Sequence, residues 1–318
     1  MPYCIELTGQ EEIVEQLRQQ ILANVLSTSY LIQGEGVTEA CLAKEWAKAV
    51  NCREGNLFKK CACTSCGKIE RQTHPDVHWI GIEEDRSLKI EAMREVQQKA
   101  MLQPYEGQLK VFIMHQAERL TEEAGNSLLK LLEEPPPQNL FILVTEYPDR
   151  LLPTIRSRLT TMTMATLTQE RLKLLLAQQY QWPAEEINFL AKASDGRLGK
   201  AVRLHEKGFF AYKNQLIDGF LNDGSQMLWS EADTTDRQKT LEMLQAFSSF
   251  IRDAWVYRLT GNETLVLNQD RLTDVQAYMG EKTLEQLEEA VNRMDQACMN
   301  LNDNLNARLV LMQVETIL

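Results

Sequence analysis

The first half of the chain alternates short apolar runs with amphipathic segments, and this alternation constrains the fold more than any other feature. Apolar runs at 30–32, 77–82, 110–114 and 141–144 are typical of buried strands, and segments with helical spacing separate them. Strands that alternate with helices usually pair in parallel, with helices on both faces of the sheet. The sequence therefore predicts an α/β module built on a parallel sheet.

The second half has a different character. After about residue 165 the strand-like runs disappear, and amphipathic helical patterns continue to residue 318. We therefore expect three parts: the α/β module at 1–165, a small helical lid at 166–207 and an all-α C-terminal domain at 208–318. The last helices carry apolar residues at the helical period, namely Leu284, Leu287, Val291, Met294, Cys298, Leu301 and Leu305.

The charge balance is acidic. Lys and Arg number 34 and Asp and Glu number 45, which gives a formal net charge of −11. A chain that binds DNA phosphates through its overall field is normally basic, so we expect protein partners and only local or indirect contact with DNA. There is no apolar run of about 18 residues that could span a membrane, and the N-terminus lacks the pattern of a signal peptide. The sequence thus predicts a cytoplasmic protein without a membrane partner.

The segment 31–44 occupies the place of a strand–loop–helix phosphate site. Gly34 and Gly36 supply a flexible loop, but a working loop also needs a Lys for the β- and γ-phosphates and a Ser or Thr for Mg²⁺. Glu39 and Ala40 stand at these two positions, and the loop is about one residue short. A carboxylate in place of the lysine turns attraction into repulsion, which amounts to several kcal/mol at low dielectric. Taken alone, the loop fits an ordinary glycine turn as well as a degenerate phosphate loop.

The strand-like run at 111–114 decides between these interpretations. His115 and Gln116 follow it, where an ATPase needs an acidic pair to hold Mg²⁺ and to activate water. Imidazole and amide groups cannot supply those negative charges. Both halves of the catalytic centre have lost their charged groups, so we expect a pseudo-ATPase that binds no ATP of its own.

Four of the seven cysteines form a tight group, Cys52, Cys61, Cys63 and Cys66. In a reducing compartment such a group indicates metal binding before disulfide formation. Four thiolates suit a closed tetrahedral Zn²⁺ site, and the spacing of Cys63 and Cys66 is typical of a zinc knuckle. Redox or iron–sulfur use has no support from the flanking residues. We expect a structural zinc insertion at 52–66 with no catalytic role.

The segment 110–136, KVFIMHQAERLTEEAGNSLLKLLEEPP, resembles the second nucleotide motif of bacterial DNA polymerase III clamp-loader subunits, AAA+ proteins, and the delta-prime type above all. The resemblance continues through the sensor-1 strand at 141–145 and the Ser-Arg-Cys motif at 152–158. Weaker matches lie at 7–10, 74–77 and 304–309. The resemblance implies an AAA+ P-loop-like module with a zinc-knuckle insertion, followed by a helical lid and a helical collar domain.

The Ser-Arg-Cys motif gives the resemblance its main functional consequence. In the family, its arginine reaches across a subunit interface to the γ-phosphate of ATP bound by the adjacent motor subunit. Ser157 and Arg158 stand at the motif positions, and Leu159 replaces the cysteine. The resemblance therefore implies that Arg158 is an arginine finger in trans, a planar cation that stabilises the transferring phosphoryl group. Without the family, Arg158 would be taken for a surface ion-pair residue, and nearby Arg156 could be mistaken for the finger.

One further residue and one spacing leave parts of the resemblance open. Thr145 falls at the sensor-1 position, where it could equally satisfy the end of a strand. The family spaces its zinc cysteines by eight, two and two residues, whereas this chain has eight, one and two between Cys52 and Cys66. The shortened spacing leaves the geometry of Cys61 open.

The resemblance also implies the partners. It places the chain in a hetero-pentamer with delta and gamma/tau-type motor subunits, and in indirect contact with the sliding clamp and primed DNA. An active AAA+ ATPase is one alternative, opposed by Glu39, Ala40, His115 and Gln116. A zinc-dependent nucleic-acid-binding module is another, opposed by the −11 charge and by the lack of interleaved aromatic and basic residues.

Overall fold

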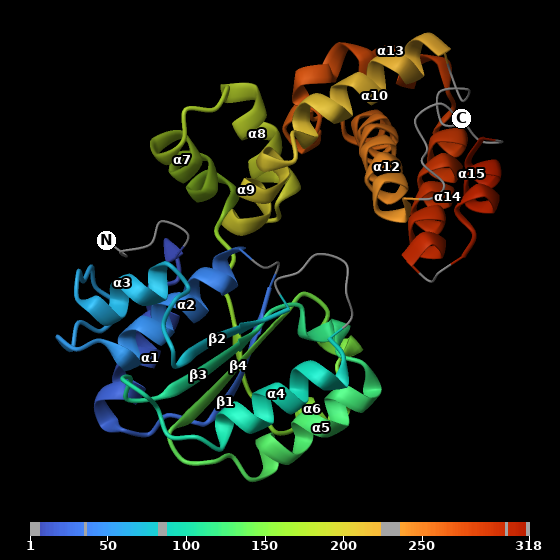
Figure 1. The fold of residues 1–318 in the computed structure, drawn as a ribbon. Helices are drawn as coiled ribbons and strands as arrows, with labels where there is room; N and C mark the ends of the chain where they lie inside the picture. Colours follow the sequence, from blue (N-terminus) through green and yellow to red (C-terminus); the bar gives the residue numbers. More distant parts are fainter. Residues whose placement is uncertain (1–6, 35–36, 82–87, 224–235, 303–304, 316–318) are drawn as a thin grey trace. The chain divides into compact units, whose positions relative to one another are not determined.

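The computed structural model of the 318-residue chain describes residues 7–34, 37–81, 88–223, 236–302 and 305–315. Gly36 of the expected phosphate loop and Ile82 of the second expected strand lie outside these ranges. The chain forms two compact units (Figure 1). The sheet unit comprises Met1–Leu167 with Leu198–Lys200, and the helical unit comprises Thr168–Arg197 with Ala201–Leu318.

A five-stranded parallel sheet forms the centre of the sheet unit, with the strand order β2-β3-β4-β1-β5. In the register, Leu31 lies opposite Leu143 and Thr161. Every residue of β3 and β4 is buried, as expected for strands that are covered on both faces. The predicted parallel α/β module is thus confirmed. The strands are β1 (Ser29–Gln33), β2 (Val77–Ile80), β3 (Lys110–Met114), β4 (Asn139–Thr145) and β5 (Thr160–Thr163).

Helices cover both faces of this sheet (Figure 1). Side chains alternate along each strand, so Val111 and Ile113 of β3 pack toward α1 and α2, whereas Phe112 and Met114 pack toward α4, α5 and α6. The helices on the first side are α1 (Glu11–Ala23), α2 (Val37–Asn51) and α3 (Thr64–Glu70). Those on the second side are α4 (Ile90–Ala100), α5 (Glu122–Glu133) and α6 (Pro153–Arg156).

Helix α5 shows how the sequence sets its own limits. Thr121 is the N-cap, and its hydroxyl oxygen accepts a hydrogen bond from the Ala124 N–H at 3.2 Å. Leu128 is fully buried, so the helix packs its apolar side onto the sheet. Three prolines at 135–137 follow, and the helix ends at Glu133. This end point matters because Glu133 lies beside Arg158.

Every regular element in the described part of the helical unit is a helix, and none of the described helices is both long and apolar enough to cross a membrane. Aromatic rings from α10, α12 and α13, those of Phe220, Phe247, Phe250 and Tyr278, form part of the core. The helices are α7 (Gln169–Gln179), α8 (Ala184–Ala193), α9 (Leu198–Glu206, which begins in the sheet unit), α10 (Phe209–Asp223), α12 (Arg237–Thr260), α13 (Leu272–Glu281), α14 (Leu284–Asn302) and α15 (Ala307–Glu315). Short 3₁₀ helices lie at η2 (Ala117–Arg119), η3 (Pro148–Arg150), η4 (Glu263–Leu265) and η5 (Gln269–Arg271).

A buried cation joins the early and late helices of this unit. Lys213 on α10 is fully buried, and its Nζ lies 2.7 Å from Oδ2 of Asp270 in η5. The ammonium also lies 4.6 Å from the ring centre of Phe189 and 4.7 Å from that of Phe210. On α8, Lys192 Nζ donates to two backbone carbonyl oxygens of the α12–α13 connection, at 2.8 and 2.6 Å. These contacts fasten α8 and α10 to that connection.

Candidate functional site

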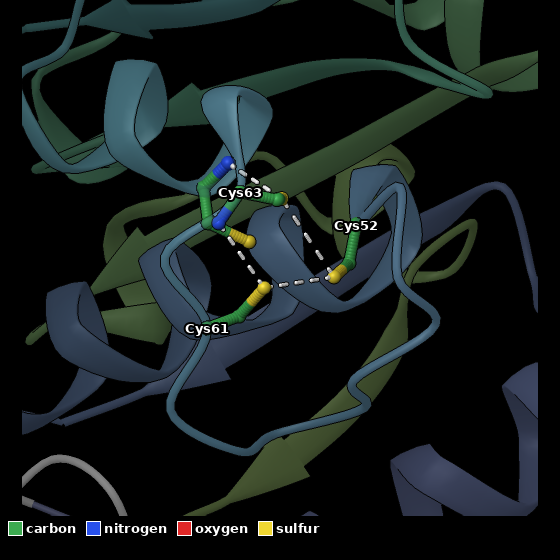
Figure 2. Close-up of side chains that lie close together, drawn as sticks. Cys52, Cys61 and Cys63 are labelled. Atoms are coloured by element: carbon green, nitrogen blue, oxygen red, sulfur yellow. Dashed lines mark hydrogen bonds between the residues drawn. The ribbon is translucent and has the colours of Figure 1, made fainter.

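The four predicted metal ligands come together in the sheet unit. Cys52 follows α2, Cys61 lies in the loop before α3, and Cys63 and Cys66 lie at the start of α3. Their sulfur atoms all lie within 4.8 Å of one another. Cys52 Sγ is 3.6 Å from Cys61 Sγ and 4.0 Å from Cys63 Sγ (Figure 2). Tetrahedral Zn²⁺ with Zn–S bonds of about 2.3 Å requires sulfur separations of about 3.8 Å. The donor set therefore fits zinc, and the short spacing between Cys61 and Cys63 does not separate the sulfurs.

Local backbone geometry holds Cys63 in place. It is the N-cap of α3, and its sulfur accepts a hydrogen bond from the Cys66 N–H at 3.5 Å. Burial raises the pKa of the Cys63 thiol, but hydrogen bonds from the backbone N–H groups of Cys66 and Arg53 outweigh it and lower the pKa to about 6. Burial raises the pKa of the Cys66 thiol. The cluster thus contains one thiol that ionises readily, and the thiolate is the form that binds metals.

Ion pairs fasten α3 to α2. Lys48 Nζ lies 2.7 Å from Glu45 Oε1 and also pairs with Glu70 of α3. The side chains of Lys48 and Glu45 are only 8% and 4% exposed, so this charge needs its partners. Lys44 adds a second contact to Glu70, at 2.8 Å. The cysteine insertion is therefore anchored on a helix of the sheet unit.

Buried acceptors hold the loop that precedes β3 against the insertion. The Asp76 carboxylate accepts hydrogen bonds from the N–H groups of Tyr105, Glu106 and Gly107, at 2.7 to 2.8 Å. Burial raises the pKa of Asp76, but these three donors outweigh it and leave the pKa below its usual value. Glu106 in turn accepts from Lys68 Nζ of α3 at 2.7 and 2.8 Å. Asp76 lies in the weakly matching segment 74–77, but its hydrogen bonds to residues 105–107 could not be predicted, because pairing between separate segments leaves no local pattern.

Glu39 lies at the carboxyl end of β1 and does not point into solvent. The residue is 5% exposed, and its carboxylate lies against the backbone of Gly34. A Cβ placed on Gly34 would lie 1.6 Å from Glu39 Oε1. Ala40 offers only a methyl group beside it. The start of α2 therefore presents an acid, a methyl group and a glycine where the sequence suggested a phosphate loop.

His115 and Gln116 follow β3 at the same edge of the sheet. The His115 ring stacks on the Trp79 ring, with centroids 5.6 Å apart and an interplanar angle of 8°. Burial lowers the pKa of His115, so the ring is neutral at pH 7. Gln116 is exposed and has a left-handed backbone with φ of 52°. Neither residue places a negative charge at the end of β3.

An acid that the sequence analysis missed does lie near this edge. Glu118 in η2 accepts a hydrogen bond from the Thr145 hydroxyl, with an Oγ1–Oε2 distance of 2.6 Å. Thr145 Oγ1 in turn accepts from the Tyr147 N–H at 3.2 Å. The hydroxyl at the sensor-1 position is thus engaged on both sides within the chain. The only sequence signal for Glu118 is an acidic residue a few positions after a buried strand.

Arg158 lies just beyond α6, and its guanidinium is held by two elements. Nη2 is 2.6 Å from Glu133 Oε1 at the end of α5. Nη1 donates to the Thr154 carbonyl oxygen at 2.8 Å and to Ser157 Oγ at 3.4 Å. The Arg158 side chain is 35% exposed. Arg156 has a separate partner, Asp149, at 2.7 Å, so the structure distinguishes the two arginines.

The family comparison covers most of the chain. The family described as DNA polymerase III, delta subunit, matches residues 9–168, and its C-terminal counterpart matches residues 207–316. The delta' subunit of Bacillus subtilis DNA polymerase III is 28% identical in an alignment 322 positions long, which covers 94% of this chain and 93% of that protein. This similarity runs across both units.

Relatives of another type share only part of their length with this chain. The tau subunit of B. subtilis is 31% identical over 63% of this chain, and the tau subunit of Escherichia coli is 26% identical over 76% of it. The chain spans about a third of these tau proteins, 36% and 37% of their lengths.

Solved structures show more distant likenesses. A DNA polymerase III gamma subunit-related protein of Thermotoga maritima has a TM-score of 0.47 and 21% identity, with coverage of 95% of this chain and 98% of that one. Sequence alone carries the assignment, through two family matches that cover nearly all of the sheet unit and residues 207–316 of the helical unit. The chain belongs to the DNA polymerase III delta-subunit family and is similar to a delta' subunit over nearly its whole length.

Proposed function

We propose that this chain hydrolyses no ATP and instead completes the ATP site of a neighbouring motor subunit with Arg158. The observation that carries the proposal is the contrast between two sites in the sheet unit. A partly exposed guanidinium lies after α6, whereas the chain's own phosphate-loop position holds a carboxylate.

The carboxyl edge of the sheet supports the loss of ATP chemistry. Glu39 Oε1 lies beside Gly34, in the space that a phosphate would need in a working loop. Two negative groups at that separation repel one another strongly, since little water screens a buried carboxylate. His115 is neutral and Gln116 is uncharged, so neither position of the expected acidic pair offers an anionic ligand for Mg²⁺, and the nearby Glu118 carboxylate already accepts a hydrogen bond from Thr145. The proposal therefore includes no ATP bound by this chain.

Arg158 has the chemistry that the neighbour's site requires. Its guanidinium is planar and always charged, and it can stabilise the negative charge on a transferring phosphoryl group. Ser157 lies beside it and contacts Nη1, so we assign Ser157 a supporting role. The proposed finger acts in trans, on ATP held by the adjacent gamma/tau-type subunit.

The proposed assembly is a hetero-pentamer with delta and the motor subunits, which acts on the sliding clamp and, indirectly, on primed DNA. The net charge of −11 favours protein partners over DNA. The last two helices also expose large apolar side chains, as expected for a protein interface: Met299 on α14, and Leu309 and Met312 on α15. We place this assembly in the cytoplasm, with replication.

We further propose that Cys52, Cys61, Cys63 and Cys66 hold a structural Zn²⁺. The closed set of four sulfurs leaves no position for substrate, which is typical of structural and not catalytic zinc. Bound zinc would tie α3 to the end of α2. The insertion contributes few large apolar residues, so metal binding would supply much of its folding free energy.

The test is ATP hydrolysis by the reconstituted loader, stimulated by clamp and primed DNA. Arg158→Ala should lower turnover strongly, because an arginine finger contributes about 10³–10⁵ to the rate at the site it serves. The fall in total turnover should be smaller if the loader has other ATP sites that do not depend on Arg158. Arg156→Ala is the matched control and should leave turnover unchanged, with assembly of both variants checked by gel filtration. Unchanged turnover in Arg158→Ala would leave the chain a purely architectural subunit.

A further inference from the structure

We propose that Glu133 is a positioning residue for Arg158. This inference rests on the proposed finger role and adds a second residue to it. The Glu133 carboxylate holds Nη2 at 2.6 Å while the Thr154 carbonyl oxygen holds Nη1 at 2.8 Å. A planar group that is fixed at two of its nitrogens has a defined orientation.

The contacts leave the guanidinium able to bind a phosphate. It carries five N–H donors, and among the residues that the structure describes its partners are Glu133, Thr154 and Ser157. Donors that these three do not use remain for a ligand from another subunit. The carboxylate therefore orients the cation without using all of its N–H donors.

An exposed ion pair often contributes little, and these two side chains are 35% and 49% exposed. The packing beneath the pair distinguishes it from an incidental contact. Gly125 of α5 lies so close to α6 that an added Cβ would be 2.9 Å from Leu152 Cδ1 and 3.3 Å from Ile155 Cδ1. Helix α5, which ends at Glu133, is thus in tight contact with α6, which ends two residues before Arg158, and the core fixes their relative position.

Fixed orientation acts on the chemical step. A cation already held in place needs less reorganisation when charge develops on the phosphoryl group. Loss of Glu133 should therefore lower kcat more than it changes KM for ATP. A carboxylate that only stabilised the fold would change assembly or thermal stability and would leave kcat per assembled loader unaffected.

The experiment uses the full reconstituted loader with clamp, primed DNA and ATP, and it compares Glu133→Gln with Glu134→Gln. The control removes the same charge from the adjacent, exposed residue. We expect Glu133→Gln to lower kcat about threefold to tenfold with KM nearly constant, and Glu134→Gln to leave both unchanged. The double variant Glu133→Gln with Arg158→Ala should be no slower than Arg158→Ala alone, because Glu133 acts through the arginine.

Three results would overturn the inference. One is an unchanged kcat in Glu133→Gln together with a strongly reduced kcat in Arg158→Ala. Arg158 would then act as the finger without needing Glu133. Another is a faster Glu133→Gln loader, which would mean that the carboxylate restrains the arginine. The third is a double variant in which the two effects multiply. If Arg158→Ala itself has no effect, both the finger and its positioning residue are refuted.

Discussion

The cysteine cluster and the carboxyl edge of the sheet belong to the same unit, yet they match the residue pattern of a working site to different degrees. The cluster retains four donors, all within 4.8 Å of one another. The carboxyl edge has an acid at Glu39, a methyl group at Ala40 and a neutral ring at His115. A working ATP site needs a lysine, a hydroxyl group and an acid at these positions. A fold can lose groups that act on a ligand while it keeps the groups that hold its own segments together.

The two regions also differ in what their polar groups contact. Around the cysteines, Asp76 and Lys48 each bind groups on other segments and so connect parts of the fold. At the carboxyl edge, Glu118 and Thr145 bind each other, and Glu39 lies against Gly34. The polar groups of the first region connect separate segments of the fold, whereas those of the second region contact one another.

The largest effect that can test this contrast is loss of the metal. Cys63→Ser should abolish stoichiometric zinc binding and lower the free energy of unfolding by more than about 3 kcal/mol, because metal binding supplies folding energy to the insertion. Metal analysis by mass spectrometry and urea denaturation would measure both. Cys298→Ser, at a partly buried thiol on α14, should keep the zinc. Equal zinc content in Cys63→Ser and the wild type would contradict the assignment.

The second prediction concerns the carboxyl edge. The double change Glu39→Lys and Ala40→Thr should improve ATP binding by the isolated chain at least about 100-fold, since reversing one close charge is worth several kcal/mol. It should not produce hydrolysis, because His115 and Gln116 remain. Titration with a fluorescent ATP analogue and a phosphate-release assay would separate the two results. Tight binding by the wild type would show that this edge is still a nucleotide site.

The third prediction is a pH dependence that arises in the sheet unit. Burial, followed by nearby Lys99 and Lys110, lowers the pKa of His78 to about 4. An unfolded histidine has a pKa of about 6.5 and takes up its proton first as the pH falls. The free energy of unfolding should therefore be unaffected by His78 above about pH 6.5. Between about pH 6.5 and 4 it should fall by about 1–2 kcal/mol, because this ring is partly exposed.

Urea denaturation at several pH values would measure this loss, and His78→Phe should flatten the slope. Phenylalanine can keep the stacking on Phe112, whose ring centre lies 5.0 Å from that of His78. An identical slope in the variant and the wild type would assign the acid sensitivity to other groups. His74 and His115 are the first to examine, because burial also lowers their pKa values.

The smallest expected effect is that of a single anchoring charge. Glu70→Gln removes the partner of Lys44 and Lys48 on α3. Because the Glu70 side chain is 50% exposed, the change should lower the free energy of unfolding of the zinc-loaded protein by only about 0.3–1 kcal/mol. A loss above about 2 kcal/mol would mean that the ion pairs, and not the sulfurs, dominate the stability of the insertion.

The sequence predicted the parts of the fold that depend on continuous burial. Three strands were recognisable because the runs at 30–32, 111–114 and 141–144 within them consist of apolar side chains that are all buried. Strand β5 was not predicted, since only Met162 of its four residues is buried and the other three are exposed threonines. A short edge strand of this kind has no hydrophobic period to detect.

Some features of the candidate sites could likewise be predicted from the sequence, and others could not. The cysteines and the replaced nucleotide residues could be identified from residue type and position. The pairing of Arg158 with Glu133, and that of Thr145 with Glu118, joins segments that are distant in sequence. Such pairs depend on how α5, α6 and the sheet edge pack, so they required coordinates.

The buried ammonium of Lys213 has a consequence for motion. A cation between two aromatic rings and Asp270 cannot be withdrawn without leaving a carboxylate unpaired in the core. Helices α8 and α10 should therefore move together with the α12–α13 connection as one rigid body. Any bending of the helical unit is then expected outside these three segments, which would be displaced together.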